Sequence, residues 1–293
     1  MQVSPVIQGV LRCGAQRIDL REPKVMGVLN VTPDSFYDGG QHYSATASGS
    51  KLLVDRALLS AEAMLGQGAT IIDIGGESTR PGAAPVTEQQ ELDRVVPVVE
   101  AIAANLDVVI SIDTSTAQVI TEAASAGAGL INDVRALERP GALAAAVASG
   151  LPICLMHMQG GPQTMQENPS YQDVVTEVGD YLRARIAAVH EASVGSSPQL
   201  LLDPGFGFGK TDEHNLELMR RLSELAELGY PLLIGVSRKS MIGRLLGRQP
   251  EQRLAGSLAL AYAALVNGAK IIRAHDVAET RDIVKIFNCV MNK

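Results

Sequence analysis

The sequence has little of several residue types, and each shortage excludes a class of protein. It contains no tryptophan, and aromatic residues make up only 3% of its 293 residues. The three cysteines, Cys13, Cys154 and Cys289, are odd in number and form no CxxC pair. They argue against a disulfide framework and a zinc knuckle, and they favour a reducing, cytoplasmic setting.

The chain also lacks long apolar runs and an excess of basic residues. No stretch of about 18 uncharged apolar residues occurs, and residues 1–20 lack the basic start and apolar run of an export signal. Lys and Arg total 25 against 32 for Asp and Glu, a net charge of −7. We therefore expect neither membrane nor nucleic acid as a partner, and any anion site must be local.

Short apolar, β-branched runs recur along the chain and predict strands. There are eight of them, at residues 25–30, 70–75, 108–113, 130–133, 151–158, 200–203, 232–236 and 270–274. The longer Ala- and Leu-rich segments between them predict helices. Several end in glycine just before the next strand, and glycine readily adopts the left-handed backbone conformation that commonly ends a helix. These glycines are Gly68, Gly127, Gly150, Gly229 and Gly268.

The fold class follows from this alternation. Eight strand-helix units whose strands are too apolar to have a wet face favour a closed parallel (β/α)₈ TIM barrel over an open doubly wound sheet. No linker divides the chain, so we predict an α/β fold with residues 1–293 as a single domain. Residues 6–10 and 17–20, around Cys13 and Gly14, predict an N-terminal β-hairpin that caps the barrel bottom. Residues 32–50 and 77–87 are expected to form long loops.

Nearly every predicted strand ends in a polar residue, where barrels of this kind place their active sites. A single Asp or Asn at a strand end can simply cap a helix or fix a loop, but so many together indicate a site. In chain order the residues are Asn30, Asp73, Asp113, Asn132, Asp133, His157, Asp203, Ser237, Arg238, Lys239, Arg273 and His275.

These side chains predict two kinds of binding. Asp113, Asn132, Asp203 and Lys239 can converge on a flat heterocycle that carries both donors and acceptors. Arg273 and His275, two residues apart at the last strand, can face one phosphate or diphosphate, in the corner where this fold usually binds phosphate. Asn30, on the first strand, would lie beside them once the barrel closes.

Three further patterns need separate interpretation. Residues 203–211, DPGFGFGKT, nearly match a phosphate-binding GxxxxGK[ST] loop, but Pro204 replaces the first glycine, so we reject an ATPase. Cys154 and His157 have no third metal ligand near them, and structural roles are favoured. Phe36, Phe206 and Phe208 fall in predicted loops, where aromatic residues often cover ligands.

Two long motifs resemble the dihydropteroate synthase family of pterin-binding TIM barrels. They are MGVLNVTPDSFYDGG at residues 26–40 and DIGGESTRPG at residues 73–82. Shorter matches follow at residues 111–113, 131–133, 155–158, 203–210, 237–240 and 273–276, so that the resemblance spans roughly residues 24–282. Tyr37 and Ala274 depart from the commoner residues of the family, at positions that supply no chemistry.

The resemblance implies a reaction and a role for each residue. The enzyme would join (7,8-dihydropterin-6-yl)methyl diphosphate to 4-aminobenzoate (p-aminobenzoate), with a cationic methylene forming as diphosphate departs. Catalytic roles would fall to Lys239, Arg273, His275 and Asp38. The pterin would bind to Asp113, Asn132, Asp203 and Lys239; the diphosphate to Asn30, Thr79, Arg80, Arg273 and His275; and p-aminobenzoate to Phe36, Thr79, Pro81, Phe208, Ser237 and Lys239.

The family also implies a cofactor and an assembly. Mg²⁺ would bridge the diphosphate to Asn30, since this cation takes few protein ligands beside substrate phosphates. A homodimer would form through the helices of the last units, with residues 254–266 as the candidate face. Two alternatives stay open: a pterin-binding methyltransferase, which would not need residues 32–36 or 237–239, and a catalytically silent pterin-binding paralogue, which would not need an intact polar set.

Overall fold

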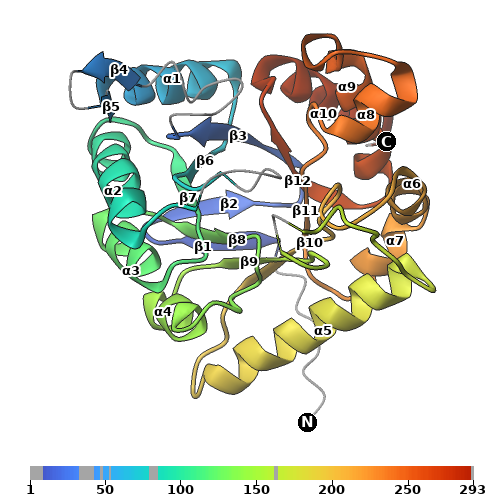
Figure 1. Ribbon diagram of the computed structural model, residues 1–293, viewed down its shortest axis with the longest axis horizontal. Coiled ribbons are helices and arrows are strands. Elements are labelled where there is room, and N and C mark those ends of the chain that lie inside the picture. The colour runs from blue at the N-terminus through green and yellow to red at the C-terminus, as the bar shows by residue number, and fades with distance from the viewer. Residues whose placement is uncertain are drawn as a thin grey trace.

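A computed structural model describes residues 9–32, 43–46, 49–52, 54–78, 85–161 and 164–291, and every structural statement below concerns these ranges. Eight parallel strands close into a barrel surrounded by helices (Figure 1). The predicted (β/α)₈ barrel is therefore confirmed. The single-domain organisation of residues 1–293 stays a prediction, because some of them fall outside the described ranges.

The barrel strands agree closely with the eight apolar runs. In chain order they are β3 (Lys24–Asn30), β6 (Ile71–Gly75), β7 (Val109–Asp113), β8 (Leu130–Asp133), β9 (Ile153–Met156), β10 (Leu200–Asp203), β11 (Leu232–Ile234) and β12 (Ala269–Ala274). The last strand pairs with the first, Ile272 opposite Val25, which closes the ring. Most strand residues are buried on both faces, which explains why the runs read as continuously apolar.

Helices follow the barrel strands and cover the outside of the barrel. They are α1 (Val54–Gln67), α2 (Glu88–Asn105), α3 (Ala117–Ala126), α4 (Ala142–Ser149), α5 (Val174–Ala192), α6 (Asp212–Arg220), α7 (Leu222–Ala226), α8 (Ser240–Leu246), α9 (Leu254–Val266) and α10 (Val277–Met291), with a 3₁₀ turn at Pro250–Gln252. The five predicted helix-ending glycines all have positive φ, between 67° and 115°. Among the described helices, none has both the length and the apolar character needed to cross a bilayer.

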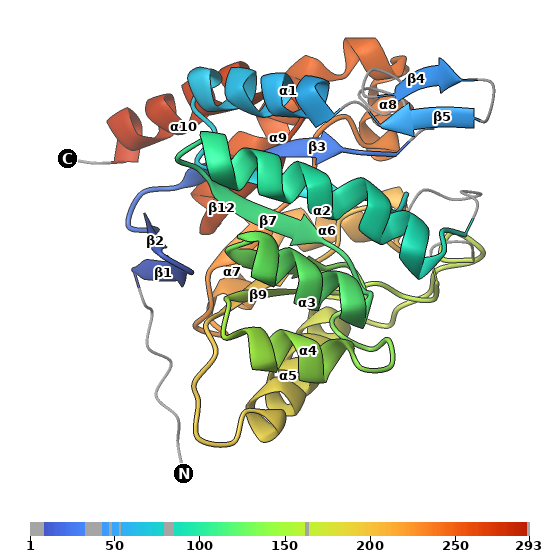
Figure 2. The same ribbon diagram turned by 90° about the vertical axis from the view of Figure 1, so that its left-hand side faces the viewer.

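A hairpin closes one end of the barrel. Its strands are β1 (Val10–Cys13) and β2 (Gln16–Asp19), and the buried side chains of Leu11, Cys13 and Ile18 form one cluster with the lowest layer of the barrel interior. In Figure 2 the arrowheads of β3 and β7 point away from this hairpin, which therefore lies at the amino ends of the barrel strands. The predicted cap is thus confirmed. Its first strand is described from Val10, with Leu11 and Cys13 buried, and residues 6–8 of the predicted strand lie outside the described residues.

A second hairpin lies at the opposite end, within the predicted loop of residues 32–50. Strands β4 (Tyr43–Thr46) and β5 (Gly49–Leu52) pair only with each other, antiparallel, and join no barrel strand. Figure 2 shows them beyond the carboxyl end of β3. The segment therefore contains regular structure that its Gly-, Ser- and Thr-rich composition did not predict.

Candidate active site

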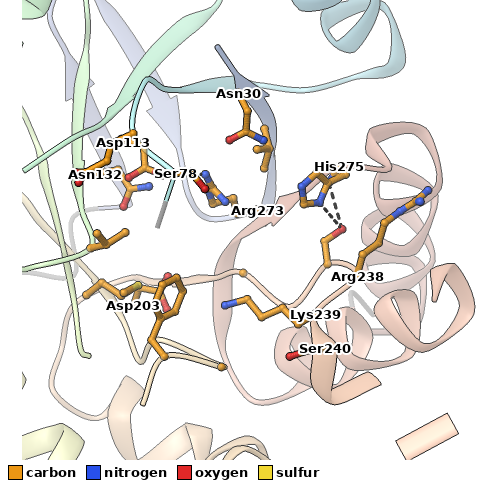
Figure 3. Close-up of a pocket in the computed structure, with 18 of the residues that line it drawn as sticks. Asn30, Ser78, Asp113, Asn132, Asp203, Arg238, Lys239, Ser240, Arg273 and His275 are labelled. Atoms are coloured by element: carbon orange, nitrogen blue, oxygen red, sulfur yellow. Dashed lines mark hydrogen bonds and ion pairs between the residues drawn. The ribbon is translucent and has the colours of Figure 1, made fainter. Parts of the chain in front are cut away.

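A cavity of about 500 Å³ opens at the carboxyl ends of the strands. Of the predicted strand-end residues, Asp73, Asp133 and His157 are buried and are not among those that line it. All the residues given a binding or catalytic role that lie within the described ranges line it (Figure 3), although they come from separate barrel strands and the segments that follow them. They are Asn30, Asp113, Asn132, Asp203, Phe208, Ser237, Lys239, Arg273 and His275. The other predicted site residues, Phe36, Asp38, Thr79, Arg80 and Pro81, lie outside the described residues.

Arg273 connects the polar groups at the centre of the barrel. Its Nε donates to Asp73 Oδ2 at 2.6 Å, and its Nη2 donates to Asp113 Oδ2 at 3.0 Å. Asn132 Nδ2 donates to the same Asp73 oxygen at 3.1 Å. Asp73, which is fully buried, therefore fixes both a cation and an amide that face the cavity. Its other oxygen, Oδ1, has no hydrogen-bond partner among the described residues.

Burial and neighbouring charges shift the pKa values of the ionisable groups here. Burial, and then the charge of Asp73, raise the pKa of Asp113 to about 8, while Arg273 opposes the shift. Burial would lower the pKa of Arg273, but the two carboxylates outweigh it and raise that pKa. Burial lowers the pKa of Lys239 to about 8, with Asp203 opposing. Burial therefore makes the charged forms of Asp113 and Lys239 costly, and hydrogen bonds to these groups would reduce that cost.

Asp203 and the residues after it form the side of the cavity next to Lys239. Asp203 Oδ1 accepts from the Gly205 amide at 2.7 Å, and burial raises the pKa of its carboxyl. Figure 3 shows Lys239 reaching toward Asp203 from beside Ser240. The Lys239 ammonium lies 4.4 Å from the centre of the Phe208 ring, within range of a cation–π interaction.

The turn after β11 contributes three residues to the cavity lining, Ser237, Arg238 and Lys239. Ser237 Oγ lies 3.1 Å from His275 Nδ1 and accepts from the His275 amide. Between Ser237 and Lys239, Arg238 has a φ of +54°, an unusual value for a non-glycine residue. It is held there by an ion pair with Asp276 and by a hydrogen bond that its backbone amide donates to Ser257 Oγ at 2.8 Å.

An ion-pair cluster fixes the start of the loop that follows β6. Glu77, whose side chain is only 13% exposed, pairs with Arg135 at 3.1 Å and Arg139 at 3.0 Å. Arg94 of α2 donates to the Gly76 carbonyl at 2.8 Å. Glu77 and Ser78 line the cavity, so this cluster fixes one edge of the site. No local sequence pattern indicates this cluster, because its members come from separate strand-helix units.

The structure separates the other motifs into structural and cavity-lining residues. Lys210, the lysine of the phosphate-loop-like motif, is 1% exposed and bonds to His157 Nδ1 at 2.9 Å. Burial and Lys210 lower the pKa of His157 to about 3, so its ring is neutral, in agreement with a structural role. Phe206 lies fully inside the hydrophobic core, so the prediction that it covers a ligand is wrong.

Some cavity residues were missed from the sequence. Met156, Met165 and Arg253 line the cavity, but only Met156 lies at the end of a predicted strand. Met165 and Arg253 lie between elements and carry no distinguishing pattern. Asp73 was recognised as a strand-end residue, yet its contact with Arg273, 200 residues away, becomes visible only once the barrel closes.

Comparison with known proteins agrees with the geometry. The family model described as "Pterin binding enzyme" matches residues 26–275. The dihydropteroate synthase of Escherichia coli K12 is 54% identical over 275 residues, covering 94% of each chain. The Yersinia pestis dihydropteroate synthase, solved as a complex with a sulfonamide drug, has 53% identity and a TM-score of 0.91, covering 97% of this chain and 100% of that one.

A further solved relative bears on the ligand. The Xanthomonas albilineans dihydropteroate synthase in complex with 7,8-dihydropteroate has 42% identity and a TM-score of 0.84, covering 97% of this chain and 99% of the other. The likeness therefore extends over nearly the whole chain in both sequence and structure. This chain belongs to the pterin-binding enzymes and, among them, to the dihydropteroate synthase family of transferases.

Proposed function

We propose that the cavity joins (7,8-dihydropterin-6-yl)methyl diphosphate to p-aminobenzoate, forming 7,8-dihydropteroate and releasing diphosphate, a step of folate biosynthesis. The observation that carries the proposal is one cavity with a polar floor for a heterocycle and cationic residues beside it. Membership of the dihydropteroate synthase family supports the same reaction.

The pterin ring is assigned to Asp113, Asn132, Asp203 and Lys239. A pterin has N–H donors on one edge and a carbonyl and ring nitrogens as acceptors, so carboxylates, an amide and an ammonium together match it. All four side chains face the cavity, and Asn132 and Asp203 are almost fully buried. Buried partners favour a ligand that satisfies every one of them, because an unpaired buried polar group is costly.

The diphosphate is assigned to Asn30, Arg273 and His275, together with Thr79 and Arg80 outside the described residues. In the structure Arg273 donates to both Asp73 and Asp113. We expect substrate to exchange the Asp113 contact for a phosphate oxygen while Asp73 keeps the guanidinium in place. Arg273 and His275 would then stabilise the charge that develops on the leaving diphosphate.

A magnesium ion belongs to the proposal, with Asn30 as its protein ligand. Among the described residues, no group of three or more His, Cys, Asp or Glu side chains can hold a metal. A single amide oxygen that lines the cavity still fits Mg²⁺, which usually takes one or two protein ligands beside phosphate oxygens and water. Bound there, Mg²⁺ would neutralise charge on the diphosphate.

The second substrate is assigned to Phe208, Ser237 and Lys239, with Phe36, Thr79 and Pro81 outside the described residues and Asp38 beside the amine. The Phe208 ring offers an apolar face to the benzene ring, and Ser237 and Lys239 offer donors to the carboxylate. We propose that the C–O bond to diphosphate loosens first and that the aniline nitrogen then attacks the cationic methylene carbon. Exclusion of water would protect that carbon from hydrolysis.

The deciding experiment is a coupled assay of pyrophosphate release from the dihydropterin diphosphate and Mg²⁺, with and without p-aminobenzoate. Release that depends on p-aminobenzoate, with dihydropteroate formed, is the expected result. Tight pterin binding without product would instead support the silent paralogue, and methyl transfer to a corrinoid protein would support the methyltransferase.

We also propose a cytoplasmic homodimer. Large exposed apolar side chains lie on α8, α9 and α10, namely Leu245, Leu246, Val266, Ile286, Val290 and Met291. They lie on or near Leu254–Val266, the predicted contact face, and a second copy would cover them. Light scattering should give twice the 30.9 kDa chain mass, and a monomeric mass would refute the dimer. The three free cysteines suit a reducing compartment.

A further inference from the structure

Lys210 is a buried lysine that the proposed reaction does not use. It is 1% exposed and follows residues 205–209, which we call the glycine loop. Its ammonium lies 2.9 Å from His157 Nδ1, 2.9 Å from the Gly205 carbonyl oxygen and 3.0 Å from the Phe208 carbonyl oxygen. Three acceptors match the three N–H donors of an ammonium, so Lys210 ties both ends of the loop to the end of β9.

The glycine loop carries two contacts to the cationic side of the cavity. The Phe206 carbonyl accepts a hydrogen bond from the Lys239 ammonium, and the Phe208 ring lies 4.4 Å from the same nitrogen. Lys239 and Phe208 both line the cavity. The position of the loop relative to the barrel therefore sets the position of Lys239, which is proposed to bind the pterin, and of the Phe208 ring, which is proposed to contact p-aminobenzoate.

The loop is fixed from its outer side as well. Asn215 Oδ1 accepts from the Gly207 amide at 2.7 Å, and Gln166 Nε2 donates to the Gly207 carbonyl at 2.7 Å. Tyr171 donates to the Gly209 carbonyl at 2.7 Å. These partners hold the outer backbone, while Lys210 is the buried side-chain donor to the carbonyls of Gly205 and Phe208. The Gly205 carbonyl also accepts from the Phe208 amide at 3.1 Å.

We propose that Lys210 is a positioning residue for the reaction: it holds the glycine loop so that Phe206 and Phe208 place the Lys239 ammonium in the cavity. The inference rests on the proposed function, in which Lys239 and Phe208 contact the substrates. Without Lys210, the Phe208 carbonyl and a neutral imidazole would lose this donor, and the Gly205 carbonyl would keep only the Phe208 amide at 3.1 Å. The loop would then move until water satisfied the unpaired groups. The competing explanation is that Lys210 only stabilises the fold.

The test uses Lys210→Met, which keeps a long side chain and removes the donors. We expect kcat/KM for p-aminobenzoate, corrected for the folded fraction, to fall about 100-fold, the usual penalty for misplacing a catalytic group by about 1 Å. The matched control is Val189→Ala, which removes buried volume from the last turns of α5, at the other end of the barrel. It should lower Tm and leave kcat/KM unchanged.

Two further measurements separate positioning from stability. In a Phe208→Ala background, Lys210→Met should lower kcat/KM much less than it does in the wild type, because both changes act through one loop. Hydrogen exchange of the loop amides in the ligand-free protein should accelerate in Lys210→Met and not in Val189→Ala. Additive losses, or a wild-type kcat/KM in folded Lys210→Met, would overturn the proposal.

The exchange measurement needs no substrate, which keeps the two proposals apart. Unchanged exchange of the loop amides in Lys210→Met would overturn the role of Lys210 even in an active synthase. Failure of the wild type to release pyrophosphate would overturn the proposed function and leave the exchange result standing.

Discussion

Adding a methyl group at Gly205 tests how closely the glycine loop must approach β9. Gly205 has a φ of +70°, and a Cβ there would lie 1.8 Å from the His157 carbonyl oxygen. Ordinary contact begins at 3.4 Å, so the loop or β9 must move by about 1.6 Å (3.4 − 1.8) in Gly205→Ala. Because Gly205 also holds Lys210 through its carbonyl, the displacement would reach Phe208 and Lys239.

Gly150 supplies a matched control. Its φ is +67°, nearly the same, but a Cβ there would meet nothing within 4 Å. Gly150→Ala should therefore show only the conformational penalty of a left-handed residue, about 1–2 kcal/mol. Gly205→Ala should lose more stability in urea unfolding and, in pyrophosphate release, about 100-fold or more of kcat/KM. Equal stability losses with normal activity in both variants would refute the steric reasoning.

Three other predictions concern charged residues of the cavity. Arg273→Ala should weaken binding of the diphosphate substrate by about 2 kcal/mol or more, and binding of free pterin far less, in calorimetry; equal losses would place the anion site elsewhere. Lys239→Ala should lower kcat about 100-fold to 1000-fold, and a near-normal rate would exclude its assignment. The pKa of Asp113 is raised from 3.8 to about 8, so the stability given by its protonated form is complete below pH 4 and is lost as pH rises to 8. Asp113→Asn should thus gain stability relative to wild type as pH rises across that range, measured by urea unfolding.

The barrel could be predicted from sequence because its strands are buried on both sides. A strand with one solvent-exposed face alternates apolar and polar residues, which makes it harder to distinguish from a loop in the sequence. Strands β6, β8 and β10 are instead buried at every residue. The hairpin at the barrel bottom alternates buried and exposed residues, and residues 6–8 of its predicted first strand lie outside the described residues. The turn was predicted correctly, because Gly14, with a φ of +63°, marks it.

The residues that line the cavity could largely be predicted from the sequence, but the contacts between their side chains could not. Strand-end residues can be read from the sequence once the strands are known, and Asp113, Asn132 and Asp203 were found in this way. The contacts of Asp73 and Glu77 depend on which strand ends become neighbours after closure, and no local pattern encodes them. Phe206 and Phe208 are two residues apart in one loop, yet one is in the core and the other faces the cavity.

The hairpin of β1 and β2, residues 10–19, forms a plug at the barrel bottom. The two ends of the barrel can therefore be altered independently. Leu11, Cys13 and Ile18 close the end opposite the cavity, and the described part of the chain opens that cavity at the carboxyl ends of the strands. Substitutions in the plug should change the unfolding temperature while leaving substrate affinity as it is. A reporter protein fused ahead of Gly9 would emerge on the sealed side, which makes that end the one to tether when an open active site is needed.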